Sequence, residues 1–363
     1  MKHECSKHKG YYIDRIKGGI KVYPVKDFSL KQIFECGQCF RWRKVSADIC
    51  GIDSGLCSEV YSGVAKGKAL IVYMENSTNR YSGADSLGVG YSGADYSDVK
   101  RTSNEFSGAG YPSTANSNDR KYAAEAPDTL VLIGANYDDF VNIWYDYFDL
   151  GTNYCEIKNE LSKNAIMREA IHFGSGIRIL KQDFFEALIS FILSANNRIP
   201  MISRTVERYC EAYGTKIIET GYSFPKADVL SQLSEYDLKT LGGGFRCKYV
   251  VSTAAMYHGT PDLEQRLYNS STNEARTLLT RFPGVGDKVA CCALLFSGIK
   301  TDVFPVDVWV RRIMERLFFS VKASDKGIQG FARETFGKWT GIAQQYLFYY
   351  ARETTGSVST SSR

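Results

Sequence analysis

A lysine and an aspartate in the last quarter of the chain are residue types that nucleophilic catalysis uses. Lys288 lies on a helical pattern that is otherwise apolar for two turns, from Val289 to Phe296. A charged side chain is costly in such a stretch unless it is needed, and an amine kept neutral there is a nucleophile. Asp307 follows a proline-containing loop and precedes a helical segment, which is the position of an N-cap. Taken singly, each residue is better explained without a function, as a solvated lysine and a capping aspartate.

The turn before Lys288 favours a functional role for both residues. A helical pattern ends near Arg281, and the turn Pro283-Gly284-Val285-Gly286 offers two glycines that are free to adopt positive φ. A second helix is expected from Asp287. Such a helix-hairpin-helix points backbone N–H groups outward at a helix N-terminus, where a DNA phosphate is a natural ligand. The order of hairpin, lysine and aspartate therefore favours an enzyme that acts on DNA.

Length and composition indicate two or three globular domains. The chain has 363 residues, which is more than one hydrophobic core usually holds, and 44% of them are hydrophobic. No segment approaches the ~20 apolar residues of a membrane span, and the N-terminus lacks the apolar core of a signal peptide. We therefore expect a soluble, intracellular protein that does not contact a membrane.

Charge is unevenly distributed along the chain. The net charge is +5, but residues 1–44 alone carry +7 and the remainder carries −2. Solvation is the usual role of such a basic segment, and contact with nucleic acid is the alternative that needs independent support.

The ten cysteines are expected to be free thiols, because the chain has no secretion signal. Cys36, Cys39, Cys50 and Cys57 are four possible zinc ligands, but the second pair is spaced too widely for a common zinc ribbon. No cysteine follows Cys292, so a C-terminal four-cysteine run of the kind that holds an iron–sulfur cluster is missing from the sequence. We predict neither a metal nor another cofactor.

Residues 1–136 read as an N-terminal antiparallel β domain. Strand patterns occur at 69–74 and 129–133. Between them, residues 81–127 are rich in Ser, Gly, Asn and Asp, and the sequence Tyr-Ser-Gly-Ala-Asp occurs twice. This repeat is too short and polar for a solenoid unit, so the segment is expected to be a disordered insertion between two strands.

Helical periodicity begins after Asp139, where apolar residues recur at helical spacing. We expect a helical domain formed by residues 137–220 and 323–363, and a helix-hairpin-helix catalytic domain formed by residues 221–322. The predicted fold class is α+β.

Five ordered segments resemble the 8-oxoguanine DNA glycosylase branch of the helix-hairpin-helix (HhH-GPD) superfamily. They are residues 37–42 (GQCFRW), 190–197 (SFILSANN), 242–246 (GGGFR), 279–307 with the hairpin, and 343–348 (AQQYLF). The resemblance implies a TBP-like antiparallel β domain followed by a mostly α-helical HhH-GPD core. It also implies a monomeric, bacterial-type enzyme of the cytoplasm that excises 8-oxoguanine from duplex DNA by base flipping.

The resemblance assigns the chemistry to the lysine and the aspartate. Lys288 attacks the anomeric carbon of the damaged nucleotide and expels the base, and the resulting Schiff base permits strand cleavage by β-elimination. Asp307 stabilises the positive charge that develops on the sugar, besides capping its helix.

Four further positions match the pocket that receives the extruded base. The carbonyl of Gly37 accepts from the N–H that 8-oxoguanine gains and guanine lacks, so that guanine leaves an acceptor unmet. Cys292 and Phe348 sandwich the base, and Gln344 bonds its Watson–Crick edge.

The remaining matches contact DNA around the lesion. The resemblance implies that Asn196 fills the gap left by the extruded base and bonds the orphaned partner base. It also implies that Phe245 is a wedge into the base stack and that Arg246 contacts the unpaired base. The alternatives are a helix C-cap for Asn196 and core packing for Phe245. The backbone contacts are assigned to the hairpin, at Gly284, Gly286 and Val289.

Two DNA-binding positions depart from the family pattern. Trp309 stands where many relatives carry a histidine near a phosphate, and Met201 stands where eukaryotic members carry an arginine that reads the opposite cytosine. The phosphate contact and the selectivity for the opposite base are therefore left open.

Two other functions remain as alternatives. The same lysine chemistry could remove a different modified purine, which would change the pocket and keep the mechanism. A helix-hairpin-helix module could also bind the DNA backbone without catalysis, although the presence of both Lys288 and Asp307 argues against that function.

Overall fold

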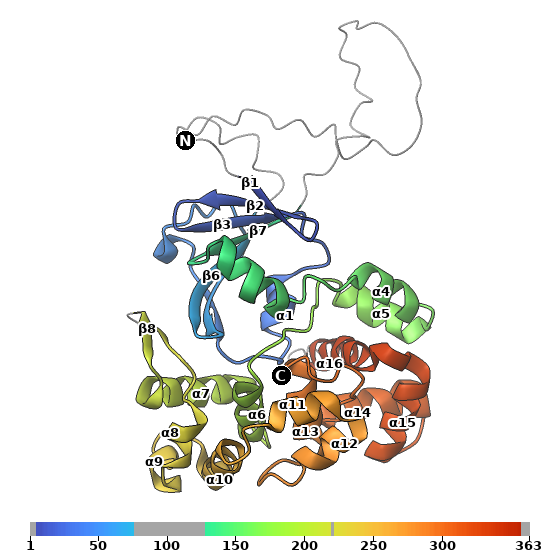
Figure 1. Cartoon of the computed structure of the whole chain (residues 1–363). Coiled ribbons are helices and arrows are strands. Elements are labelled where there is room, and N and C mark those ends of the chain that lie inside the picture. The colour runs from blue at the N-terminus through green and yellow to red at the C-terminus, as the bar shows by residue number, and fades with distance from the viewer. Residues whose placement is uncertain (1–4, 76–127, 219–220, 357–363) are drawn as a thin grey trace, which may run out of the picture.

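The computed structural model describes residues 5–75, 128–218 and 221–356 (Figure 1). The expected insertion at 81–127 lies outside these residues. The chain forms a β-sheet region, followed by a larger helical region that Figure 1 shows below it. The predicted α+β class is confirmed, whereas the predicted domain boundaries stay predictions.

The sheet has seven strands, paired antiparallel in the order β1-β2-β3-β7-β6-β5-β4. Strand β7 joins the two halves of the sheet, because it pairs with β3 on one side and with β6 on the other. The strand patterns predicted at 69–74 and 129–133 are confirmed as β6 and β7. The strands are β1 Cys5–His8, β2 Tyr11–Ile16, β3 Gly19–Tyr23, β4 Trp42–Val45, β5 Val60–Ala65, β6 Lys68–Glu75 and β7 Thr129–Ile133.

A short helix and a helical segment cover one face of the sheet. The helix is α1, Leu30–Phe34, and the segment runs through α2 (Tyr137–Asp139), η5 (Phe140–Trp144) and α3 (Tyr145–Tyr147). Their buried aromatic side chains share one core with the strands. Trp42 of β4 stacks on a phenylalanine of α1 and donates its indole N–H to the hydroxyl of Tyr147 at 2.8 Å.

The helical region consists of two groups of helices on either side of α6 and α13 (Figure 1). A short hairpin, β8 Lys216–Ile218 with β9 Gly221–Tyr222, was not predicted; its strands are too short for a periodic signal. The helices are α4 Tyr154–Leu161, α5 Ala165–Phe173, α6 Phe184–Leu193, α7 Ile199–Tyr213, α8 Ala227–Ser231, α9 Glu235–Lys239, α10 Cys247–His258, α11 Leu263–Asn269, α12 Thr272–Leu279, α13 Asp287–Phe296, α14 Val308–Met314, α15 Asp325–Phe336 and α16 Thr340–Gly356.

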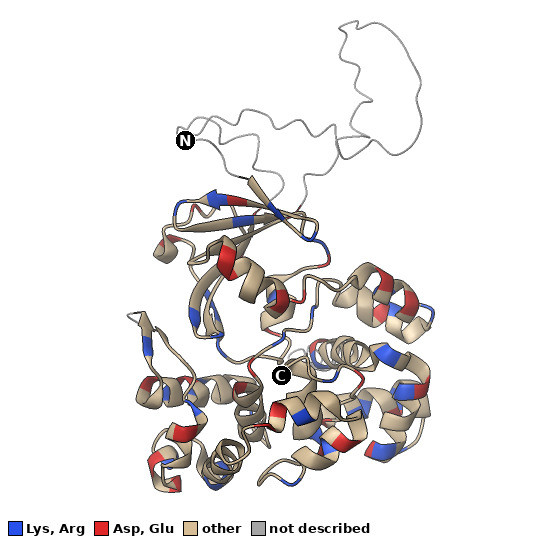
Figure 2. Cartoon of the chain, viewed as in Figure 1, with Lys and Arg blue, Asp and Glu red and all other residues tan. Residues whose placement is uncertain are grey.

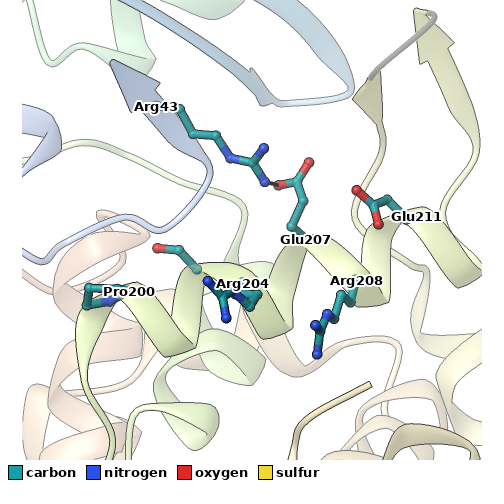
Figure 3. Close-up of a pocket in the computed structure, with 7 residues that line it drawn as sticks. Arg43, Pro200, Arg204, Glu207, Arg208 and Glu211 are labelled. Atoms are coloured by element: carbon teal, nitrogen blue, oxygen red, sulfur yellow. Dashed lines mark ion pairs between the residues drawn. The ribbon is translucent and has the colours of Figure 1, made fainter. Parts of the chain in front are cut away.

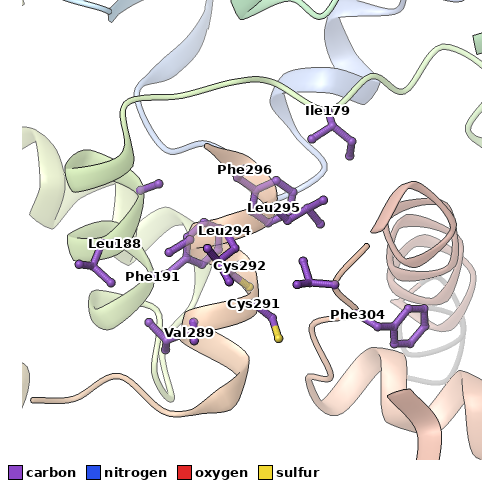
Figure 4. Close-up of a cluster of buried hydrophobic side chains, with 14 of the residues drawn as sticks. Ile179, Leu188, Phe191, Val289, Cys291, Cys292, Leu294, Leu295, Phe296 and Phe304 are labelled. Carbon is purple, nitrogen blue, oxygen red and sulfur yellow. The ribbon is translucent and has the colours of Figure 1, made fainter. Parts of the chain in front are cut away.

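Helix α13 lies at the centre of the helical core (Figure 4). Every residue from Val289 to Phe296 is buried, which explains why this stretch is apolar all round. Phe296 stacks on Phe191 of α6 with ring centroids 5.2 Å apart. The pairing of α6 with α13 fixes the end of the helix that carries Lys288.

None of the described helices is long and apolar enough to cross a bilayer. Within the same residues, no three His, Cys, Asp or Glu side chains lie together as a metal site would require.

Candidate active site and DNA interface

The hairpin before α13 has the predicted turn, but only one of its glycines has positive φ. Gly284 has φ +76°, whereas Gly286 is extended, with φ −84° and ψ 179°, and is the N-cap of α13. The turn is fixed on α10 by Thr253, whose hydroxyl donates to the carbonyl of Pro283 at 2.7 Å. Since Gly286 has no side chain to cap α13, the N–H groups of the first turn remain for another acceptor.

We expect the two hairpin glycines to respond differently to alanine. A Cβ on Gly284 would lie 2.6 Å from the Cβ of Tyr249, in addition to the strain of positive φ, so Gly284→Ala should cost about 1 to 3 kcal/mol or more. Nothing lies within 4 Å of a Cβ on Gly286, which makes Gly286→Ala the matched control. Thermal unfolding of the DNA-free variants measures this difference. Equal Tm values for the two variants would contradict the tight packing at Gly284.

Lys288 is in the N-terminal turn of α13, and its side chain reaches the C-terminal end of α6. Its half-buried side chain places Nζ 3.0 Å from the hydroxyl oxygen of Ser194 and 5.0 Å from the ring centroid of Phe191. Ser194 is the C-cap residue of α6, and its hydroxyl donates to the carbonyl of Phe191. The amine is therefore directed by one polar partner and one aromatic face. Sequence reasoning did not predict Ser194, because nothing in the pattern of α6 indicates a partner 94 positions away.

Asp307 is the N-cap of α14, as predicted, and accepts a hydrogen bond from the N–H of Val310 at 2.8 Å. Burial raises the pKa of its carboxyl, and the bond from Val310 and the charge of Lys288 oppose that rise. The aspartate is therefore half-buried and close enough to the lysine to interact with it electrostatically.

Cys292 lies one turn after Lys288 on α13, and its thiol is close to both Lys288 and Asp307. Burial raises the pKa of its thiol to about 11; the nearby Lys288 lowers this pKa, and Asp307 raises it further. The thiol is thus neutral at physiological pH and does not compete with the amine as a nucleophile. The structure therefore brings together three of the predicted site residues, Lys288, Cys292 and Asp307.

Gly37 is held so that its carbonyl remains available. The carbonyls on either side are occupied, since that of Cys36 accepts from Gln345 at 2.9 Å and that of Gln38 accepts from Gln182 at 2.7 Å. In the part of the chain that the structure describes, no hydrogen bond engages the carbonyl of Gly37. Two buried glutamine side chains therefore fix an unused acceptor between them.

A second group of predicted pocket residues meets at Gly37. Gly37 has φ +81°, and a Cβ there would lie 3.2 Å from the ring of Phe348, so the backbone approaches the aromatic face closely. Gln344 precedes Phe348 by four residues, hence by about one turn of α16. Its side chain is buried, and its Oε1 has no hydrogen-bond partner among the described residues. A buried amide oxygen without a partner is costly unless a ligand supplies one.

The residues predicted to face the base stack also lie together. Arg246 is buried and donates to the carbonyls of Ala195 at 2.7 Å and of Asn196 at 2.8 Å. Asn196 is exposed in the left-handed region, with φ +49°, and Ser194 is the C-cap of α6 instead of Asn196. In this structure Arg246 therefore holds the loop that presents Asn196, a role that the sequence did not predict. A contact between Arg246 and an unpaired base stays a prediction.

Phe245 does not pack in the core, which excludes the alternative given for it. Its side chain is 57% exposed, and the guanidinium of Arg246 lies 4.4 Å from its ring centroid. An exposed phenylalanine braced by a buried arginine is available to contact another molecule.

Helix α7 continues the exposed face from Asn196. Met201 is 45% exposed, and two exposed arginines that sequence reasoning missed, Arg204 and Arg208, follow it on the helix (Figure 3). They line a cavity of about 340 Å³ with Glu207, which pairs with Arg43 of β4 at 3.1 Å. In the view of Figure 2, basic and acidic residues are interspersed over the strands and helices.

Trp309, the other departure from the family pattern, lies on α14 next to Asp307. It is half-buried, and the guanidinium of Arg312 lies 5.7 Å from its ring centroid. At this position the resemblance predicts a histidine, whereas the indole offers a phosphate one neutral N–H donor and no positive charge.

Comparison with known proteins matches both halves of the chain to repair families. Residues 22–188 match the 8-oxoguanine DNA glycosylase N-terminal domain, and residues 189–336 match the HhH-GPD superfamily of base excision DNA repair proteins. The 8-oxoguanine glycosylase/lyase of Clostridium acetobutylicum, solved with DNA containing cytosine opposite 8-oxoguanine, is 35% identical. The match covers 94% of this chain and 98% of that one, with a TM-score of 0.74. The chain belongs to the 8-oxoguanine DNA glycosylase family.

Other members of the family are similarly distant in sequence. MBOgg1, solved in complex with a low-affinity DNA ligand, is 35% identical over 95% of this chain and 99% of that one, with a TM-score of 0.74. A probable N-glycosylase/DNA lyase of Methanothermobacter thermautotrophicus is 34% identical over 49% of this chain. That match spans 64% of the archaeal protein, so this chain spans less than two thirds of its curated relative.

Proposed function

We propose that this protein is a bifunctional DNA glycosylase and AP lyase that excises 8-oxoguanine from duplex DNA. The observation that carries the proposal is the placement of Lys288 and Asp307 around Cys292, with the amine 3.0 Å from Ser194. A lysine in this setting can attack the sugar and form an imine with it. A hydrolase that activates water does not need such a lysine. The relatives named as glycosylase/lyases support the same chemistry.

The proposed reaction proceeds in two steps. The unprotonated amine of Lys288 attacks the anomeric carbon and the N-glycosidic bond breaks. The base leaves with the bonding electrons and takes up the proton that the amine nitrogen loses. Asp307 stabilises the positive charge on the sugar while that bond breaks. The sugar ring then opens to an imine on Lys288, and loss of a proton from C2′ expels the 3′ phosphate by β-elimination.

Selection of the base rests on the unused acceptor at Gly37. The N7 of 8-oxoguanine carries a hydrogen that guanine lacks, and a fixed carbonyl can accept it. Guanine would present a lone pair to that carbonyl and leave it unpaired, which costs about 1 to 3 kcal/mol. We propose that Gln344 bonds the Watson–Crick edge and that Phe348 and Cys292 lie against the two faces of the base.

Double-stranded DNA is the proposed partner, bound by a monomer without a metal or other cofactor. The N–H groups at the start of α13, including that of Val289, and the backbone at Gly284 and Gly286 would contact the damaged strand. Asn196 would fill the gap left by the extruded base, Phe245 would wedge into the base stack, and Arg246 would contact the unpaired base. We place this activity in the cytoplasm of a bacterium.

Single-turnover kinetics tests the proposal against both alternatives. Duplexes carrying 8-oxoguanine, guanine or an alkylated purine are incubated with excess protein, and released base and strand breaks are measured over time. We expect rapid release of 8-oxoguanine with strand cleavage, and negligible release of guanine. Preferential release of the alkylated purine would favour the second glycosylase function, and tight binding without any release would favour a non-enzymatic DNA clamp.

Met201 is expected to affect the selectivity for the base opposite the lesion. A thioether cannot donate the charge-assisted bonds that arginine makes to cytosine, and losing such a bidentate reader removes about 1 to 3 kcal/mol of discrimination. We expect a weaker preference for cytosine over adenine than eukaryotic relatives show, and Met201→Arg should strengthen it. Excision opposite each of the four bases measures the ratio, with Met256→Arg on α10, another exposed methionine, as control. An unchanged ratio in Met201→Arg would contradict the assigned position.

A further inference from the structure

A buried amide on α15 contacts both segments that carry the proposed catalytic residues. Gln329 is 7% exposed, and its Nε2 donates to Oδ2 of Asp287 at 2.6 Å and to the carbonyl oxygen of Phe304 at 3.3 Å. Asp287 directly precedes Lys288, and Phe304 precedes Asp307 by three residues. One side chain thus bridges the start of α13 and the loop that leads to α14.

The other contacts of Gln329 leave it little freedom to rotate. Its Oε1 accepts from Nη2 of Arg276 at 3.0 Å, and the same arginine donates through Nε to Oδ1 of Asp287 at 3.0 Å. Arg276, Asp287 and Gln329 therefore form a closed set of hydrogen bonds at the wall of a cavity of about 500 Å³. Both N–H groups and the oxygen of the amide are used, which fixes its orientation as well as its place.

We infer that Gln329 is a positioning residue that sets Lys288 relative to Asp307. The inference rests on the proposed function, because it concerns the geometry of that reaction. Helices α13 and α14 are joined by a loop, and the bond from Gln329 to the carbonyl of Phe304 fixes that loop three residues before the aspartate. The bond to Asp287 fixes the turn from which the lysine projects.

If Gln329 served only folding stability, its replacement would have a different effect on the rate. Displacing a reacting group by about 1 Å can cost on the order of a hundredfold in rate, whereas a lost hydrogen bond that serves only stability lowers Tm and leaves the rate of the folded enzyme unchanged. The rate at saturating protein separates the two, since it does not depend on DNA affinity.

The test is Gln329→Met, which keeps the length of the side chain and removes both hydrogen-bonding groups. We expect single-turnover excision of 8-oxoguanine and borohydride trapping on a preformed abasic site to fall together, by about tenfold to a hundredfold. The dissociation constant for duplex DNA is measured in parallel, because Gln329 also fixes the start of α13, whose N–H groups are proposed to contact DNA; the rate at saturating protein does not depend on it. The acidic limb of the rate–pH profile should move to higher pH, since a more distant Lys288 lowers the pKa of Asp307 less.

Tyr147→Phe is the matched control, because it removes a buried hydrogen bond, to Trp42, in the sheet region. It should leave both rates unchanged. If Gln329→Met folds poorly, Asp287→Asn tests the same bridge by weakening its bonds while retaining the shape. Wild-type rates in both variants of the bridge, or a loss in excision without a loss in trapping, would overturn the inference while the proposed function stands. A wild-type protein that neither excises nor traps would overturn both.

Discussion

Replacement of Lys288 with glutamine is expected to abolish the covalent protein–DNA adduct that borohydride traps. Reduction captures only an imine, and glutamine cannot form one. Because Lys288 contacts Ser194 and the ring of Phe191 and projects from a buried helix, the neutral substitution should leave the fold and DNA binding intact. Trapping is measured by denaturing electrophoresis on an 8-oxoguanine duplex, and binding by a mobility shift.

Lys300→Gln is the control for that experiment. Lys300 donates to the carbonyl of Tyr268 at 2.8 Å, away from the site, and its replacement should leave trapping unchanged. A Lys288→Gln variant that still traps at the wild-type level would show that another amine forms the intermediate.

Asp307→Asn should slow base excision by about a hundredfold to a thousandfold, the cost of removing one group aimed at developing charge. Asparagine caps a helix as well as aspartate does, so the bond to the N–H of Val310 and the thermal stability should largely survive. Single-turnover excision and thermal unfolding measure the two effects separately.

The matched control is Asp183→Asn, at the N-cap of α6, where the side chain accepts from the N–H of Glu186 at 3.1 Å. This variant should excise at the wild-type rate. An equally active Asp307→Asn protein would reduce Asp307 to a helix cap.

Asp307 also predicts how the rate depends on pH. Because burial raises the pKa of its carboxyl above the ordinary value of 3.8, protonation removes the stabilising charge at a higher pH than for an exposed aspartate. The excision rate should therefore fall as pH decreases through that raised pKa, and this acidic limb should be absent in Asp307→Asn. A limb that persists in the variant would assign it to another group.

Local signals in the sequence were sufficient for the elements that carry the chemistry. Helix α13 begins at Asp287 as predicted, because a glycine turn and an apolar run mark the start of a buried helix. Asp307 is a cap because it precedes a helical pattern, and strands β6 and β7 follow from their apolar runs. Each of these features depends only on residues that are close together in the sequence.

The contacts that orient the site could not be predicted in the same way. Ser194 lies 94 positions from Lys288, and Gln345 lies 309 positions from the Cys36 carbonyl that it holds. Serine and glutamine occur on many helices without such roles, so their types carry no signal. Only the packing of α13 on α6, and of α16 on the Gly37 segment, creates these partners. The bond from the guanidinium of Arg246 to the carbonyl of Asn196 is another such contact, and the predicted contact of Arg246 with an unpaired base stays a prediction.

The most direct test of the central claim identifies both products of one reaction. The wild-type protein is mixed with a duplex containing 8-oxoguanine opposite cytosine in the presence of borohydride, and mass spectrometry then analyses the released base and the peptide that carries the sugar. We predict free 8-oxoguanine and a reduced adduct on Lys288, in equal amounts. Base release without an adduct, or an adduct on a different residue, would contradict the account.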